Sequence, residues 1–232
     1  IWSRLVGSEM CIRDRLMQSL PLWPAFLVCS VLLLLALWRA PWQAILSVPA
    51  RQHALLGSLV ALCLIWSFQF EVIPGLSFHP FLMTTITLVF GWCFALATGA
   101  LALALLVLVG TAQWQSLPWD WLFSAWIPAT LAYALLRVIE RLPTRNLFVY
   151  ILGLGFFGTL LTTLLNCLLL LGLFWLLLPE KALLALWDKR AFVVPLLYSE
   201  GFMNGMLVTS VTVFFPDLVK TFDDQRFLKS DP

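Results

Sequence analysis

The chain has 232 residues and a formal net charge of +2; 62% of its residues are hydrophobic and only 11% are charged. Soluble domains are roughly 45–50% apolar and about 25% charged, and even a large core leaves much surface in water, so this composition excludes a soluble fold. The sequence also lacks the Lys/Arg run or stripe expected of a nucleic-acid-binding surface.

The first segment, Ile1–Leu16, is polar, aperiodic and unlike the sequence that follows. Its core, VGSEMCIRDR, looks like translated read-through of a sequencing adapter; the alternative is a genuine amphipathic leader. We expect residues 1–16 to be non-native and the native start to lie near Met17. Residues 17–228 are then predicted to form one integral membrane domain, followed by a polar tail at 229–232.

Apolar segments of about 20 residues, enough to cross a bilayer, predict an all-α, polytopic bundle of about seven spans. The first two are Pro21–Trp38 and Ala54–Phe70, and a break with turn residues at 74 and 75 follows. The apolar run Pro80–Gly110 would be roughly 46 Å long as a single helix. We therefore divide it near Gly91 into a third and a fourth span.

The second half of the chain predicts three further spans. The fifth, Trp121–Leu136, is expected to bend at Pro128, and it follows a polar break whose tryptophans suggest an interfacial belt. These tryptophans are Trp114, Trp119 and Trp121. The sixth is a long, tilted or kinked span over Asn146–Leu178, and the seventh is Ala191–Phe215.

The basic residues give this arrangement an orientation. With seven spans, one side carries Arg39, Arg51, Arg137, Arg141, Arg145, Lys220, Arg226 and Lys229. The other side carries Lys181, Lys189 and Arg190. Cytoplasmic loops carry the excess of Lys and Arg, so the C-terminus is predicted to be cytoplasmic and the N-terminus outside.

His79 is the first candidate site residue. It ends the break between the second and third spans, on the outer side, and Pro80 follows it as a suitable first residue for a helix. A neutral imidazole there could coordinate nickel, cobalt or zinc. The alternative is an interfacial histidine that hydrogen-bonds a loop carbonyl.

The second candidate is a polar patch in the seventh span. Glu200 and Asn204 are spaced i, i+4 and share a helix face, and Gly201 and Gly205 permit close approach of a neighbouring helix. An intramembrane carboxylate suggests a cavity-lining role. The alternative is a helix-packing clamp in which Glu200 is protonated or bonded to Asn166, Thr162 or Tyr198.

Other residue patterns argue against enzymatic activity. The sequence contains no GxSxG elbow, HExxH pair or Walker A loop, and its two histidines, His53 and His79, fall on opposite faces. The five cysteines show no CxxC spacing and are expected to be apolar packing residues. Weaker candidates for a polar or ligating role are Glu71, Met83 and Cys93.

Several short motifs resemble one transporter family. The run Val72–Pro80, followed by a span ending Leu-Val-Phe-Gly91, resembles the CbiM-type substrate-binding membrane subunits of energy-coupling-factor (ECF) transporters for cobalt and nickel. The motifs at 148–158, Glu200–Gly205 and Phe215–Val219 also look like a proteobacterial branch of that group. In order, the resemblance spans about 42–228.

The resemblance implies metal import in the bacterial inner membrane. Such a subunit captures Co²⁺ or Ni²⁺ near the outer face and delivers it with a transmembrane coupling protein and cytoplasmic ATPases; by motif, His79 would be a metal ligand. Metal-binding members begin Met-His, whereas the expected start here is Met17-Gln18 and the first span contains no histidine. The rival interpretation is a non-transporting membrane scaffold or assembly protein.

Overall fold

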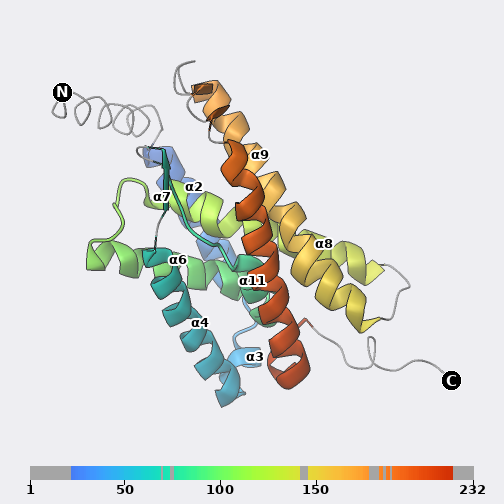
Figure 1. Cartoon of the computed structure of the whole chain (residues 1–232). Helices are drawn as coiled ribbons and strands as arrows, with labels where there is room; N and C mark the ends of the chain where they lie inside the picture. The colour runs from blue at the N-terminus through green and yellow to red at the C-terminus, as the bar shows by residue number, and fades with distance from the viewer. Residues whose placement is uncertain are drawn as a thin grey trace.

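The computed structural model describes residues 22–68, 70–73, 76–141, 146–177, 183–184, 187–188 and 190–221 as a helical bundle with one small β-hairpin (Figure 1). The expected leader at 1–16, the start near Met17 and the tail at 229–232 lie outside these residues, as do Arg145, Lys181, Lys189, Arg226 and Lys229. The first half of the bundle consists of α2 (Leu22–Arg39), α3 (Gln43–Leu46), α4 (Pro49–Ser67), β1 (Phe70–Ile73), β2 (Leu76–Phe78), α5 (Met83–Phe90) and α6 (Trp92–Val109). The second half consists of α7 (Leu117–Trp121), η1 (Leu122–Trp126), α8 (Ile127–Arg141), η2 (Val149–Gly158), α9 (Thr159–Leu177), η3 (Arg190–Phe192), α11 (Val193–Phe214) and η4 (Pro216–Leu218).

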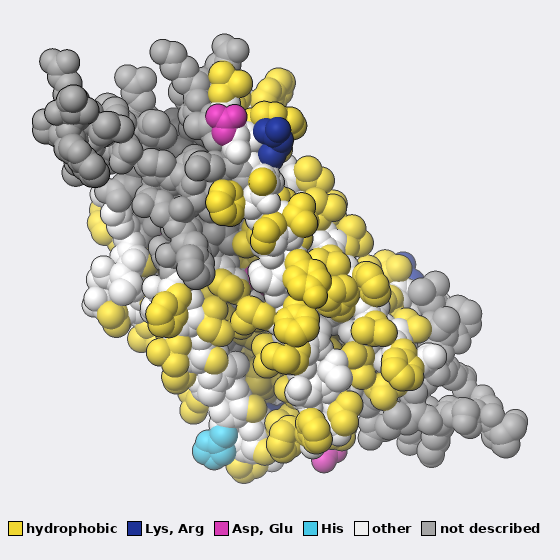
Figure 2. All heavy atoms as spheres, viewed as in Figure 1, with side chains coloured by type: hydrophobic (Ala, Val, Ile, Leu, Met, Phe, Trp, Pro, Cys, Tyr) yellow, Lys and Arg dark blue, Asp and Glu magenta, His cyan; other side chains and the backbone are white. Residues whose placement is uncertain are grey.

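Five helices of the described part are long and apolar enough to cross a bilayer: Leu22–Arg39, Trp92–Val109, Leu117–Arg141, Val149–Leu176 and Arg190–Phe214. Large apolar side chains such as Leu34, Leu108, Trp175 and Phe214 are exposed on them. Figure 2 shows hydrophobic side chains over most of the described part of one face. This surface suits hydrocarbon better than water, as the composition predicts.

The third predicted span is wrong as a crossing helix. The helical run breaks at Gly91, where predicted, but α5 has only eight residues and is about 12 Å long, against about 30 Å of hydrocarbon. An antiparallel hairpin precedes it, with Phe70 opposite Phe78. The expected turn at 74–75 lies outside the described residues.

The later segments follow the predicted pattern more closely. Val149–Leu177 is one continuous helical segment, as expected for the sixth span, and its first turns are π-helical. The helix from Leu117 contains a π-helical turn directly before Pro128. The expected tryptophan belt is wrong at Trp121, which is 3% exposed and donates its indole N–H to the Leu96 carbonyl at 3.2 Å.

Small residues bring α11 against η2 and α9, which lie beside it (Figure 1). A Cβ placed on Gly201 would lie 2.8 Å from a Leu160 methyl carbon, and one placed on Gly205 would lie 3.2 Å from the Cβ of Phe156. These distances leave little or no room for a side chain at either position. The close approach predicted for the two glycines is therefore confirmed.

Candidate functional site

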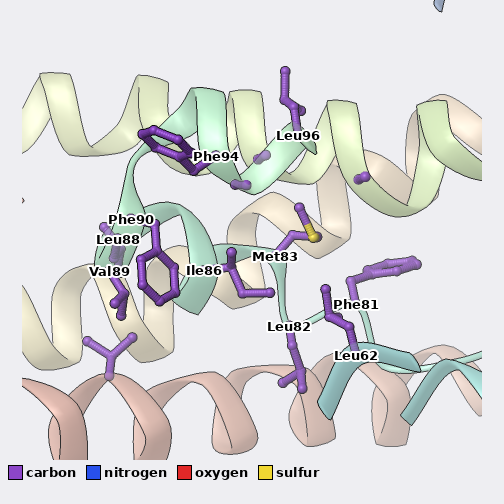
Figure 3. Close-up of a cluster of buried hydrophobic side chains, with 14 of the residues drawn as sticks. Leu62, Phe81, Leu82, Met83, Ile86, Leu88, Val89, Phe90, Phe94 and Leu96 are labelled. Atoms are coloured by element: carbon purple, nitrogen blue, oxygen red, sulfur yellow. The ribbon is translucent and has the colours of Figure 1, made fainter. Parts of the chain in front are cut away.

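Helix α5 is enclosed by the rest of the protein. All eight of its residues are buried, and α6, α8 and α11 pack around it. Figure 3 shows Met83, Ile86, Leu88 and Phe90 among the clustered side chains of the core. A buried helix must find partners for its terminal N–H and C=O groups within the protein.

Glu200 satisfies the backbone at the N-terminal end of α5. Its carboxylate, 1% exposed, accepts a hydrogen bond from the N–H of Phe81. The next residue, Leu82, has a φ of 54° and is the one non-glycine residue with positive φ in the described part of the chain. Such a conformation costs of order 1–3 kcal/mol and persists only where its surroundings hold it. Glu200 thus fixes a strained turn and lies near the positive end of the helix dipole.

Asn204 joins this carboxylate to the first turn of α5. Its Oδ1 accepts hydrogen bonds from the N–H of Thr85 at 3.0 Å and the hydroxyl of Thr85 at 2.7 Å. Its Nδ2 donates to Glu200 Oε2 at 2.9 Å and to the Glu200 carbonyl at 2.9 Å. The i, i+4 spacing read from the sequence therefore places the two side chains as one unit, which we call the α11 clamp (Glu200 and Asn204).

The chain after α11 holds the opposite end of α5. The N–H of Lys220 donates to the Val89 carbonyl at 2.8 Å, and the hydroxyl of Thr221 donates to the Leu88 carbonyl. Tyr150, buried in η2, shares a 2.7 Å hydrogen bond with Thr221. Both ends of α5 are thus bound by α11 or by the segment that directly follows it.

His79 lies three residues before Leu82, the residue with positive φ, and is 9% exposed. Its imidazole lies 4.9 Å from the Trp66 ring and 5.8 Å from the Phe81 ring, centroid to centroid. Nδ1 lies 3.4 Å from the Pro80 carbonyl oxygen, and Nε2 lies 3.3 Å from Ser124 Oγ. Burial lowers the pKa of His79, which lies outside the spanning helices, to about 4. The ring is therefore neutral at physiological pH and keeps a lone pair for a metal ion.

Asn166 stands apart from the α11 clamp. Its Nδ2 donates at 2.8 Å to the carbonyl of Phe123 in the π-helical turn, and its Oδ1 is buried with no hydrogen-bond partner among the described residues. The partners of the Glu200 carboxylate are the backbone of Phe81 and Leu82 and the side chain of Asn204, whereas Thr162 donates its hydroxyl to the Thr159 carbonyl. The geometry of Glu200 is that of a clamp between helices.

The weaker candidates take ordinary positions. Met83 is fully buried in the core, Cys93 is half-buried, and His53 is exposed at the first turn of α4. The side chain of Glu71 lies outside the described residues. Within the part of the chain that the structure describes, no three His, Cys, Asp or Glu side chains gather as a metal cluster. His79 would need further ligands from elsewhere.

Sequence reasoning missed Ser124, whose hydroxyl lies 3.3 Å from the imidazole of His79, and Trp66, whose ring packs against it. Trp66 donates its indole N–H to the Pro80 carbonyl at 2.9 Å. A serine or tryptophan in an apolar helix is unremarkable in a sequence, so neither residue type gave a signal. The available signal was Pro128, which lies four residues after Ser124 and cannot donate a helical hydrogen bond to its carbonyl.

Comparison with known proteins gives one match. The model of the CbiM family, described as the cobalt uptake substrate-specific transmembrane region, matches residues 12–218. That range contains His79, the α11 clamp and nearly all of the described helices. No curated protein and no solved structure matches the chain.

Proposed function

The chain belongs to the CbiM family of cobalt-uptake substrate-specific transmembrane regions, and on that premise we propose that it is the substrate-capture component of an ECF-type importer. Its substrate would be a divalent transition metal ion, Co²⁺ or Ni²⁺, taken up across the bacterial inner membrane. The described residues contain no Walker A loop, and neither does the rest of the sequence. A transmembrane coupling protein and cytoplasmic ATPases would supply the energy.

The observation that carries this proposal is the placement of His79. The imidazole is buried and neutral, contacts the rings of Trp66 and Phe81, and lies two residues before the N–H that Glu200 binds. Borderline metal ions favour such a nitrogen ligand, and a ligand already held in place loses little freedom on binding. In this proposal Glu200 and Asn204 brace the loop that carries His79, and Asn166 braces the neighbouring π-helical turn.

The contacts also support a topology with seven alternating segments. Arg51, at the start of α4, donates two hydrogen bonds to the Asp217 carbonyl, at 2.7 and 3.1 Å, just beyond the end of α11. The N–H of Lys220 bonds the C-terminal end of α5. In the proposed topology the chain returns to the Arg51 side at Gly91, through an extended stretch and a short helix. We infer that this basic side is cytoplasmic.

Sided labelling tests this topology. In a cysteine-free background, we expect His53→Cys and Asp217→Cys to react only with a membrane-impermeant maleimide added from the cytoplasmic side. Trp114→Cys, at a residue that is 59% exposed in the loop after α6, should react only from outside. Labelling of positions 53 and 114 from the same side would contradict the proposed arrangement.

Metal uptake tests the function. In cells that carry the chain with its coupling protein and ATPases, we expect His79→Ala to reduce accumulation of radiolabelled cobalt to the level of cells without the chain. His53→Ala, the exposed histidine, is the matched control and should leave uptake unchanged. Uptake in His79→Ala equal to wild type would contradict the proposal. Two results together would favour the scaffold role: cobalt uptake that does not depend on the chain at all, and a Glu200→Gln variant that lowers the abundance of the protein.

A further inference from the structure

Ser124 is the hydroxyl that faces the imidazole of His79. Ser124 Oγ lies 3.3 Å from Nε2, and both residues are buried. On the other side of the ring, Nδ1 lies 3.4 Å from the Pro80 carbonyl oxygen. A neutral imidazole carries a single N–H, so one ring nitrogen donates and the other accepts. The Pro80 carbonyl can only accept, so in the ion-free protein the two contacts favour the Nδ1–H tautomer, with the Ser124 hydroxyl donating to Nε2.

Pro80 and Ser124 both keep a hydrogen bond when the proton moves from Nδ1 to Nε2. The Pro80 carbonyl already accepts the indole N–H of Trp66 at 2.9 Å, so it keeps a donor even when Nδ1 carries no proton. A serine hydroxyl both donates and accepts, so Ser124 can donate to Nε2 or accept a proton from it. Alanine at this position could do neither.

The π-helical turn explains why Ser124 reaches the ring. The N–H of Ile127 bonds the Leu122 carbonyl in the wider π pattern, which leaves the Phe123 carbonyl without its usual helical donor. Pro128 has no N–H to offer, and the side chain of Asn166 supplies the missing hydrogen bond. The Cβ of Ala125, in the same turn, packs against Gly99 of α6. A Cβ added at Gly99 would lie 2.6 Å from it. The turn is thus fixed from α9 and α6.

We infer that Ser124 is a positioning residue for His79, because its hydroxyl can hold the ring at Nε2 both before and after Nδ1 binds the ion. In the ion-free protein Nδ1–H faces the Pro80 carbonyl and the Ser124 hydroxyl donates to Nε2. When Nδ1 takes a divalent transition metal ion, the same hydroxyl accepts Nε2–H. The imidazole is neutral in both states: one proton leaves Nδ1 and one joins Nε2, with no net release. This inference rests on the proposed role of His79 as a ligand.

The test uses the full chain in lipid nanodiscs, titrated with Co²⁺ or Ni²⁺ alone. Partners that orient a metal-binding histidine typically change affinity by roughly 10–100-fold, so Ser124→Ala should weaken binding by that factor. Ser124→Thr retains the hydroxyl and should recover most of the affinity. Ser210→Ala removes a hydroxyl whose partner among the described residues is the Met206 carbonyl of its own helix, and should bind as wild type does.

Nitrogen NMR of isotopically labelled histidine reports which ring nitrogen carries the proton. A purely structural role of Ser124 would leave this tautomer unchanged. The chain has two histidines, so His53→Ala and His79→Ala assign the signals. We expect the Nδ1–H tautomer at His79 in ion-free wild type, a shifted tautomer balance in Ser124→Ala, and Nε2–H with metal bound. If His79 is in the Nε2–H form in ion-free wild type, the inference is wrong. This result does not depend on whether Ser124→Ala folds.

The outcomes separate the two proposals. If His79→Ala binds cobalt as tightly as wild type, the proposed metal-capture function fails. If His79→Ala abolishes binding while Ser124→Ala keeps both wild-type affinity and wild-type tautomer, the function stands and the role of Ser124 is refuted.

Discussion

Glu200 and His79 are linked through the backbone. The carboxylate bonds the N–H of Phe81, two residues beyond the imidazole, and Asn204 connects the same carboxylate to Thr85. An intramembrane glutamate need not touch a substrate to matter, because a misplaced turn at Leu82 would also misplace His79. Removing one side chain from this buried network leaves its hydrogen-bond partners unsatisfied, which costs about 1–3 kcal/mol per group.

The variant Glu200→Gln should lower stability, measured by thermal unfolding in detergent, by about 1–3 kcal/mol. The new amide places its N–H₂ group against a donor, because the carboxylate it replaces accepts from the backbone N–H groups of Phe81 and Leu82 and from Asn204 Nδ2. In the double variant E200Q/N204D the amide at 200 can donate to the carboxylate at 204, which still accepts from Thr85, so part of the loss should return.

Asp217→Asn is the matched control for this pair, because Asp217 contributes its backbone carbonyl to the contact with Arg51 and its side chain is exposed. It should unfold as wild type does. A Glu200→Gln variant as stable as this control would show that the α11 clamp does not hold α5.

The elements around His79 depart from regular helices where they meet. Helix α5 is short and capped at both ends from α11 and its extension, and the π-helical turn η1 presents Ser124 while Asn166 completes its hydrogen bonds. Helix α6 carries Gly99 against this turn. The position of the turn therefore depends on how closely α6 can approach it.

Gly99→Ala should displace the η1 turn, because its Cβ would meet the Cβ of Ala125 at 2.6 Å, and neither atom can rotate away. We expect a loss of about 1–3 kcal/mol in thermal unfolding and weaker cobalt binding, since Ser124 moves with the turn. Gly172→Ala, where a Cβ meets nothing within 4 Å, is the control and should be neutral or slightly stabilising. Equal behaviour of the two variants would mean that α6 does not fix the turn.

Over the whole molecule, the sequence predicted the apolar segments better than their contacts. Hydropathy located the helices of the second half and the break at Gly91, but it could not show that α5 is enclosed, because lipid-facing and buried apolar residues have the same composition. His79 and Glu200 stood out because charge and imidazole are rare in such a chain. Apart from Asn204, which the i, i+4 spacing indicated, their hydrogen-bond partners are backbone groups and a serine, which carry no distinctive sequence signal.

The fold brings together sequence motifs that lie far apart in the chain. The run that ends at Gly91 contains α5, the Glu200–Gly205 motif binds its N-terminal end, and the Phe215–Val219 motif leads directly into the contact at its C-terminal end. Three separate motifs thus meet at one buried helix. We propose that this arrangement holds His79 ready to capture a metal ion.

Calorimetric titration of the full chain with Co²⁺, wild type beside His79→Ala and His53→Ala, tests that claim most directly. We expect saturable binding to wild type and to His53→Ala, and its loss in His79→Ala. Binding that survives in His79→Ala, or no binding to wild type by Co²⁺ or Ni²⁺, would contradict it.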